Sequence, residues 1–197
     1  MRQKIEKLLL NPFEDCSERS MLWTGVFAFS CGLAISYFGN IVFDGILQIH
    51  LAETDGLKTI LGNISNVTIL TIGLFALAKI LYKKVRFIDI LNNVLIARIP
   101  ILFAGLMTIS LGKFLPLSRF STEDPTTFMQ SMSQLDLAWI AVIAIFLLLF
   151  IFYFFYLLVV GVKHSINSKK HIHAILVIIT VLVLDVVAML LYRGWFL

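Results

Sequence analysis

A single carboxylate lies within the stretch ITVLVLDVVAMLLY, which runs from Ile179 to Tyr192 and is otherwise almost entirely apolar. Counted from Ala174, Asp185 is about 16 Å into a hydrocarbon core of about 30 Å. A charge at that depth costs about 2.5–3.5 kcal/mol, so ionisable residues in such positions commonly carry protons or ions. The neighbouring side chains are apolar, and this setting favours the neutral acid, which acts as a hydrogen-bond donor. Asp185 is therefore the first candidate for chemistry.

Depth along the helices also selects the partners of Asp185. Asn66 and Thr68 lie about 10–14 Å from the outer edge of their own span, level with Asp185, so hydrogen bonds between the two helices are predicted. Arg98 lies only about 6 Å below the opposite edge. Its side chain is expected to reach back to the lipid headgroups rather than to pair with the carboxylate, and a functional role stays open. Pro100 removes a backbone donor and is expected to kink that helix.

Basic residues gather in two segments between apolar stretches. Six of them form a predicted cytoplasmic basic face: Lys83, Lys84, Arg86, Lys163, Lys169 and Lys170. His164, His171 and His173 stand in the segment KHSINSKKHIH, and three imidazoles could in principle bind zinc or copper. No cysteine or carboxylate joins them, so we interpret this segment as a basic patch that faces anionic lipid headgroups, and we expect no metal site.

The elements that must position these residues are membrane-spanning helices. Of the 197 residues, 59% are hydrophobic and only 14% are charged, whereas a soluble domain has about 25% charged residues. Hydrocarbon cannot hydrogen-bond a bare backbone, and the alternating pattern of barrel strands is absent, so an all-α bundle is expected. The charged residues delimit five spans, at about 21–43, 59–78, 94–112, 137–162 and 174–192.

The distribution of Lys and Arg orients these spans. With the amino terminus in the cytoplasm, the cytoplasmic segments hold eleven of the 16 Lys and Arg, the opposite side holds four, and Arg98 lies within a span. Such a bias over short loops is the positive-inside signal. Trp23 at an inner edge, with Trp139 and Trp195 at outer edges, fits an aromatic belt. We therefore predict a cytoplasmic amino terminus and an external carboxyl terminus.

The first 20 residues differ in pattern from the rest. Ile5, Leu8 and Leu9 share one face of a short amphipathic helix, which is expected to lie on the inner membrane surface and to end at Asn11-Pro12. We therefore divide the chain into a cytoplasmic amphipathic segment, 1–20, and a five-span domain, 21–197. The sequence has no phosphate-binding loop, no metal-spaced cysteines and no nucleophile elbow, so we expect neither an enzyme nor a cofactor.

Four longer stretches carry a resemblance to a known family. They are LLLNPF (Leu8–Phe13), VRFIDILNNVLIARIP (Val85–Pro100), LDLAWIAVIAIF (Leu135–Phe146) and LVVGVKHSINSKKHIHAI (Leu158–Ile175). With the five-span layout, they resemble the YIP family of membrane proteins, named for interaction with Ypt/Rab GTPases, and the bacterial branch most of all. The resemblance implies a non-enzymatic membrane protein. The printed chain has no counterpart of the longer cytosolic amino-terminal region with which eukaryotic members engage GTPases, so a Rab-type partner is not expected.

Two functions agree with these observations. The first is a non-catalytic membrane scaffold, anchored by its spans, whose basic cytoplasmic face contacts a protein partner or anionic lipid. The alternative is a small transporter or channel subunit, in which Asp185 carries a proton or cation along a path lined by Asn66 and Thr68. The scarcity of polar groups within the spans favours the scaffold.

The same sequence features predict the partners and the location of the protein. The expected partners are the lipid bilayer and a membrane or cytoplasmic protein, with no nucleic acid, and the oligomeric state stays open. The expected location is a bacterial plasma membrane, and the alternative is an early secretory membrane.

Overall fold

Within the described residues of the computed structural model, five helical segments are long and apolar enough to cross a membrane, which confirms the predicted number of spans, and the third of them, Phe87–Gly112, consists of two consecutive helices. The structure describes residues 11–51, 56–114 and 133–196. In chain order, the elements are α2 Pro12–Asp15, α3 Glu18–Gly39, β1 Ile41–Val42, β2 His50–Leu51, α4 Gly56–Leu81, α5 Phe87–Ala97, α6 Ile99–Phe114, α8 Gln134–Ser165 and α9 His171–Phe196. Helices α4, α8 and α9 begin and end within four residues of the predicted limits.

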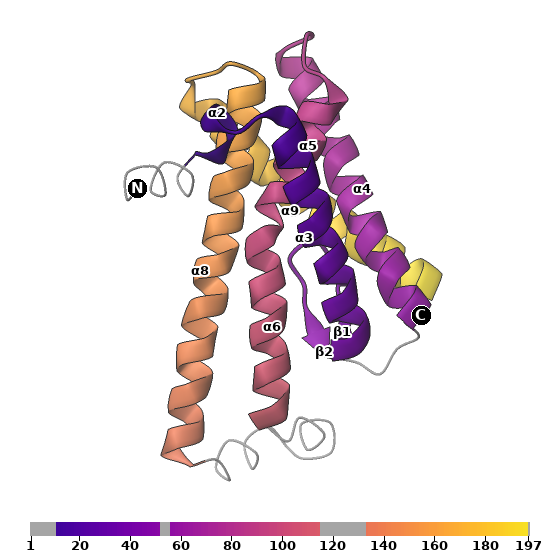
Figure 1. Ribbon diagram of the computed structural model, residues 1–197, viewed down its shortest axis with the longest axis vertical. Helices are drawn as coiled ribbons and strands as arrows, with labels where there is room; N and C mark the ends of the chain where they lie inside the picture. The colour runs from indigo at the N-terminus through magenta and orange to yellow at the C-terminus, as the bar shows by residue number, and fades with distance from the viewer. Residues whose placement is uncertain (1–10, 52–55, 115–132, 197) are drawn as a thin grey trace.

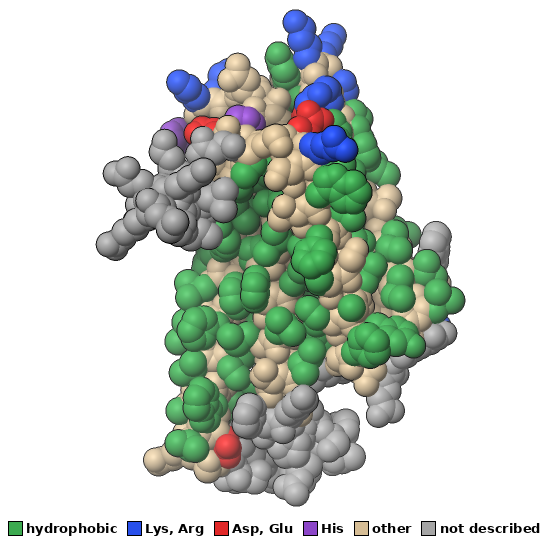
Figure 2. All heavy atoms as spheres, viewed as in Figure 1, with side chains coloured by type: hydrophobic (Ala, Val, Ile, Leu, Met, Phe, Trp, Pro, Cys, Tyr) green, Lys and Arg blue, Asp and Glu red, His purple; other side chains and the backbone are tan. Residues whose placement is uncertain are grey.

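The consecutive helices α5 and α6 form the centre of the bundle. Helices α3 and α8 each pack against both of them, α4 contacts α5, and α9 lies against α4 and α8 (Figure 1). One end of the bundle holds the start of α3, the α4–α5 loop and the α8–α9 loop, and we name it the basic end. Lys and Arg side chains gather there, beyond the hydrophobic side chains that cover the flank (Figure 2). The side of the membrane that this end faces stays a prediction.

Helix α3 approaches the central pair along a stripe of glycines spaced seven residues apart. Each glycine faces one aliphatic side chain, and the opposing residues are also seven apart: Gly25 with Leu95, Gly32 with Leu102, and Gly39 with Ile109. A Cβ on Gly25 would lie 2.6 Å from the Cβ of Leu95. Small residues at a helix contact let the two backbones come close, which is the main source of helix association where no water can be expelled.

The third span begins earlier than predicted and is interrupted. Helix α5 begins at Phe87 rather than near position 94, and it ends at Ala97. Helix α6 begins at Ile99, with Pro100 in its first turn, where a missing N–H leaves no hydrogen bond unmade. The two helices thus divide at Arg98, two residues before Pro100, and the kink expected at Pro100 stays a prediction. Because the span begins at Phe87, Arg98 lies about 16 Å from the start of α5, much deeper than the sequence count placed it.

The first span ends earlier than predicted. Asn40 adopts a left-handed conformation (φ 50°, ψ 43°), and its backbone N–H donates to the carbonyl of Ser36, which closes α3 at Gly39. Residues 41–51, which we name the hairpin, then turn back into the bundle (Figure 1). Its strands pair antiparallel, with Ile41 opposite Leu51 and Val42 opposite His50.

The amino-terminal segment is described only in part. Residues 1–10, where most of the predicted amphipathic helix falls, lie outside the described residues. Residues 11–20 contain α2 and the first residues of α3. Helix α2 packs against α8, and Phe13 is buried there beside Gly161.

Candidate functional site

The hairpin places non-helical backbone in the interior of the bundle. Ile41, Val42, Phe43 and Ile46 are all almost completely buried. Its tip, residues 43–47, contacts Asn66, which lies about 15 Å along α4 from the start of that helix. No water reaches backbone groups in a hydrocarbon layer, and each unpaired group costs several kcal/mol there. The tip therefore depends on side chains for its hydrogen bonds.

Asp185 supplies the acceptor for this tip. The backbone N–H groups of Ile46 and Leu47 donate to Asp185 Oδ1 at 2.6 and 3.0 Å. A side chain at Gly45 would collide with the carboxylate, because a Cβ there would lie 2.7 Å from Oδ1. The structure thus corrects the prediction: Asp185 accepts hydrogen bonds from the hairpin backbone, whereas it was expected to donate to a polar side chain of α4.

Asn66 supplies the matching donors. Its Nδ2 donates to the carbonyls of Phe43 and Gly45, both at 2.8 Å, and its side chain is buried. Asn66 on α4 and Asp185 on α9 thus both hydrogen-bond to the hairpin tip, and they do not hydrogen-bond to each other. The depth argument correctly placed both residues at one level, but it did not foresee the segment between them.

Arg98 lies in the core and does not reach toward the headgroups. It is only 5% exposed, its Nη2 donates to Asn63 Oδ1 at 3.5 Å, and its guanidinium lies 5.8 Å from the ring centroid of Phe43. Nη1 is buried and has no hydrogen-bond partner among the described residues. The prediction of an interface-anchored arginine is therefore wrong, because it assumed a span that begins near position 94. A guanidinium over an aromatic face gains some compensation for its desolvation.

Thr68 does not belong to this group. Its Oγ1 donates to the carbonyl of Ile64 in its own helix at 2.8 Å, and the residue is exposed. It shares with Asn66 only the wall of a mainly apolar cavity of about 220 Å³ between α4 and α9. The structure thus joins Asp185 and Asn66 through the hairpin, places Arg98 nearby against Phe43, and leaves Thr68 apart.

Asn63 and Ser36 also belong to this group, although neither was among the predicted site residues. Asn63 is buried, and its Nδ2 donates to Ser36 Oγ and to the carbonyl of Thr59, both at 3.2 Å, while its Oδ1 accepts from Arg98. The signal that could have revealed the hairpin is Asp44-Gly45, a turn dipeptide between two apolar runs.

At the basic end, Arg86 is paired within the chain. Its Nη2 lies 2.6 Å from Asp89 Oδ1 and 2.9 Å from Glu18 Oε2, which ties the start of α3 to the start of α5. Hydrogen bonds to Asp89 and then to Glu18 raise the pKa of the Arg86 guanidinium above its usual value. Arg86 therefore keeps its charge, but two neighbouring carboxylates offset it. It contributes less positive charge to the predicted basic face than was expected.

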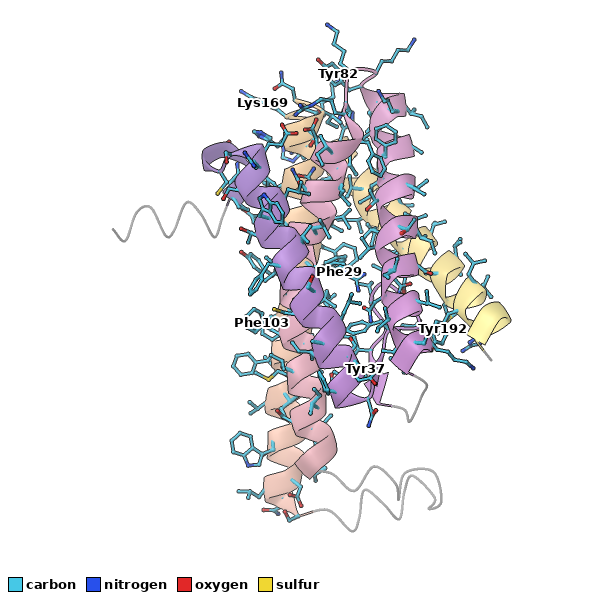
Figure 3. All side chains as sticks on the ribbon, turned by 45° about the vertical axis from the view of Figure 1, so that its right-hand side comes forward. Phe29, Tyr37, Tyr82, Phe103, Lys169 and Tyr192 are labelled. Atoms are coloured by element: carbon cyan, nitrogen blue, oxygen red, sulfur yellow. The ribbon has the colours of Figure 1, made fainter. Side chains whose placement is uncertain are left out.

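The lysines of the predicted face are more open. Lys83, Lys84, Lys169 and Lys170 are exposed, and Lys163 is half-buried. Lys169 lies at the same end of the bundle as Tyr82 (Figure 3). His164 and His171 are exposed at this end, and no group of three His, Cys, Asp or Glu residues within the described ranges is arranged to hold a metal ion.

Comparisons with family models, curated proteins and solved structures find no match for this chain. The site must therefore be interpreted from its own geometry.

Proposed function

We propose that this chain is a non-catalytic multi-pass membrane protein whose basic end faces the cytoplasm and binds an acidic surface of a partner protein. The observation that carries the proposal is the exposure of Lys83, Lys84, Lys169 and Lys170 on two loops at one end of the bundle. Arg86 holds the base of the first loop by pairing with Glu18 and Asp89. Membership of the YIP family is part of this proposal.

The loops are well suited to present their lysines at fixed positions. Val85 in the α4–α5 loop is 2% exposed, and Ile166 in the α8–α9 loop is 5% exposed, so each loop is fastened to the core by one aliphatic side chain. Exposed charges contribute mostly to the rate and selectivity of association, and their effect falls with salt. The expected interaction is therefore electrostatically steered and sensitive to ionic strength.

Photo-cross-linking in cells tests the proposal. A photoreactive phenylalanine replaces Tyr82, which is 40% exposed beside the lysines, and in a control it replaces Trp139, which is 59% exposed near the start of α8. We expect a specific protein adduct from position 82 and none of that mass from position 139. The adduct should decline at least about tenfold when the four exposed lysines become glutamine, since several steering charges are lost.

Two results would contradict this function. Adducts with lipid alone would show that the basic end meets headgroups rather than a protein. A protein adduct that survives the four Lys→Gln changes would show that the lysines do not select the partner.

The alternative, a small transporter or channel subunit, is favoured by one observation: the guanidinium of Arg98 is buried, and its Nη1 has no hydrogen-bond partner within the described ranges. Charges within spans commonly mark ion or substrate paths. Proton and cation flux into liposomes, measured for the wild type and Asp185→Asn, tests it. Flux that disappears in the variant would support transport over the scaffold, and a wild type without flux would reject it.

A further inference from the structure

An apolar cavity and a polar cavity lie next to each other at the basic end. Together they suit a ligand with a polar head and an apolar chain. The first, about 500 Å³, lies between α3, α6 and α8 and is lined mainly by apolar side chains such as Phe103, Phe150 and Leu157. The second, about 340 Å³, is polar and is lined by Glu18, Arg86, Asp89, Asn92 and His164, among others. Cys16 and Met21 line both cavities, so the two lie side by side, and we name the pair the joined cavity.

The apolar cavity extends far toward the middle of the bundle. Phe150 lies about 22 Å along α8 from Ser165, which borders the polar cavity. That length is more than half of a hydrocarbon core of about 30 Å. A ligand that fills both parts must therefore combine a polar group at the membrane surface with a long apolar chain, as a phospholipid does.

Beside the polar cavity lies an acceptor that the described residues leave unused. Asn92 is 1% exposed, and its Nδ2 donates to the carbonyl of Glu18 at 3.3 Å. Its Oδ1 is buried and has no hydrogen-bond partner in the part of the chain that the structure describes. A buried acceptor of this kind costs about 1–3 kcal/mol unless a donor reaches it. The carboxylates of Glu18 and Asp89 border the same cavity and share the single guanidinium of Arg86, so one negative charge is left over and a donor that carries positive charge fits best.

Donors border the same cavity. The Arg86 guanidinium and the His164 imidazole line it, and both side chains are exposed. Guanidinium groups are well matched to phosphate oxygens. The cavity thus offers acceptors for an ammonium and donors for a phosphate, which are the two charged groups of one zwitterionic headgroup.

We propose that this joined cavity binds a phospholipid with a primary-amine headgroup, such as phosphatidylethanolamine. The ammonium lies at Asn92 Oδ1, the phosphate lies toward Arg86 and His164, and one acyl chain lies along Phe103, Phe150 and Leu157. A choline headgroup cannot occupy the site equally well, because its quaternary nitrogen has no N–H to donate to Asn92. The site does not include the exposed lysines, so it stands independently of the proposed protein partner.

Native mass spectrometry of the full chain, released from nanodiscs that contain equal amounts of phosphatidylethanolamine and phosphatidylcholine, tests the site. We expect the ethanolamine lipid to be retained at least about tenfold over the choline lipid, because a charge-assisted hydrogen bond is lost with choline. Asn92→Leu should abolish this preference. Thr24→Trp should weaken the retention of both lipids, since exposed Thr24 borders the apolar cavity and a large ring there takes up part of its volume.

A matched control is available on the same helix. Val26→Trp introduces the same ring at a position that is 39% exposed and borders neither cavity, so it should retain the lipid as the wild type does. Because Thr24 is exposed, its variant stays informative if Asn92→Leu fails to fold.

Several outcomes would overturn the proposal. Equal retention of the two lipids, or of neither, would remove the headgroup assignment, and equal effects of Thr24→Trp and Val26→Trp would remove the chain assignment. Retention only after deletion of residues 1–10 would show that the chain's own amino-terminal segment occupies the groove.

Discussion

At the scale of single residues, Asp185 and Asn66 are matched to the opposite polarities of one turn. The hairpin tip presents two N–H groups to α9 and two carbonyls to α4, and each side chain supplies what its side requires. The bond types differ because an N–H can meet only an acceptor and a carbonyl only a donor. The two residues therefore do not tolerate the same substitution.

This asymmetry gives a prediction with two nearly isosteric changes. Asp185→Asn keeps an oxygen that can accept from Ile46 and Leu47, so it should lower the free energy of unfolding by only about 1 kcal/mol. Asn66→Asp turns acceptors toward the carbonyls of Phe43 and Gly45 and should lower it by about 2–4 kcal/mol. Reversible unfolding in mixed micelles with increasing SDS measures both.

Thr68→Ala is the control at a similar depth, because its hydroxyl bonds only within its own helix. It should change stability by no more than about 0.5 kcal/mol. An Asp185→Asn variant that unfolds as readily as Asn66→Asp would show that the charge, rather than the acceptor, holds the tip.

Residue-level prediction from the sequence succeeded for depth and failed for partners. The apolar run around Asp185 and the helical rise place it midway along α9, and Asn66 lies at the same level on α4. The partners were missed because they are backbone groups of the hairpin, and side-chain types do not show which backbone groups lie near a given residue. The Asp44-Gly45 pair signals a turn, but the continuous apolar run into Phe43 read as more helix.

At the scale of elements, the glycine stripe of α3 sets how closely that helix meets α5 and α6. Gly25, Gly32 and Gly39 recur every seven residues, and the opposing aliphatic residues keep the same period across the break at Arg98. The spacing is preserved because Arg98 keeps right-handed helical angles (φ −74°, ψ −10°) and its N–H donates to the carbonyl of Val94, so α3 packs along α5 and α6 with one period.

Gly32→Val should force α3 away from Leu102, where an added Cβ collides with the leucine side chain. Overpacking of a tight contact costs about 1–3 kcal/mol, and we expect a loss in that range. Ala34→Val on the same helix is exposed and should have almost no effect. Thermal unfolding in detergent compares them, and equal melting temperatures would show that α3 has room to shift.

The limits of the elements could be predicted only where charges mark them. Helices α4, α8 and α9 are flanked by lysine, aspartate or loop residues and were placed within four residues. The third span was placed too late because Asp89 and the polar pair Asn92 and Asn93 read as surface residues. In the structure, both asparagines are buried against neighbouring helices.

At the scale of the whole molecule, the basic end and the opposite end should lie on different sides of one membrane. Lys84→Cys and Ser133→Cys place exposed thiols at the two ends, in a background with Cys16 and Cys31 replaced by alanine. With the basic end in the cytoplasm, an impermeant maleimide added to intact cells should label position 133 only. Labelling of position 84 instead would reverse the orientation, and labelling of both would contradict a single topology.

The position of Asp185 on the last helix has a consequence for the order in which the chain is made. The hairpin leaves the ribosome before its acceptor does, because 138 residues separate Leu47 from Asp185. Until α9 arrives, the N–H groups of Ile46 and Leu47 have no acceptor from that helix. The final helix therefore completes the hydrogen bonding of the hairpin. A chain that stops before Asp185 leaves two unpaired N–H groups in the bilayer, which quality-control proteases can recognise.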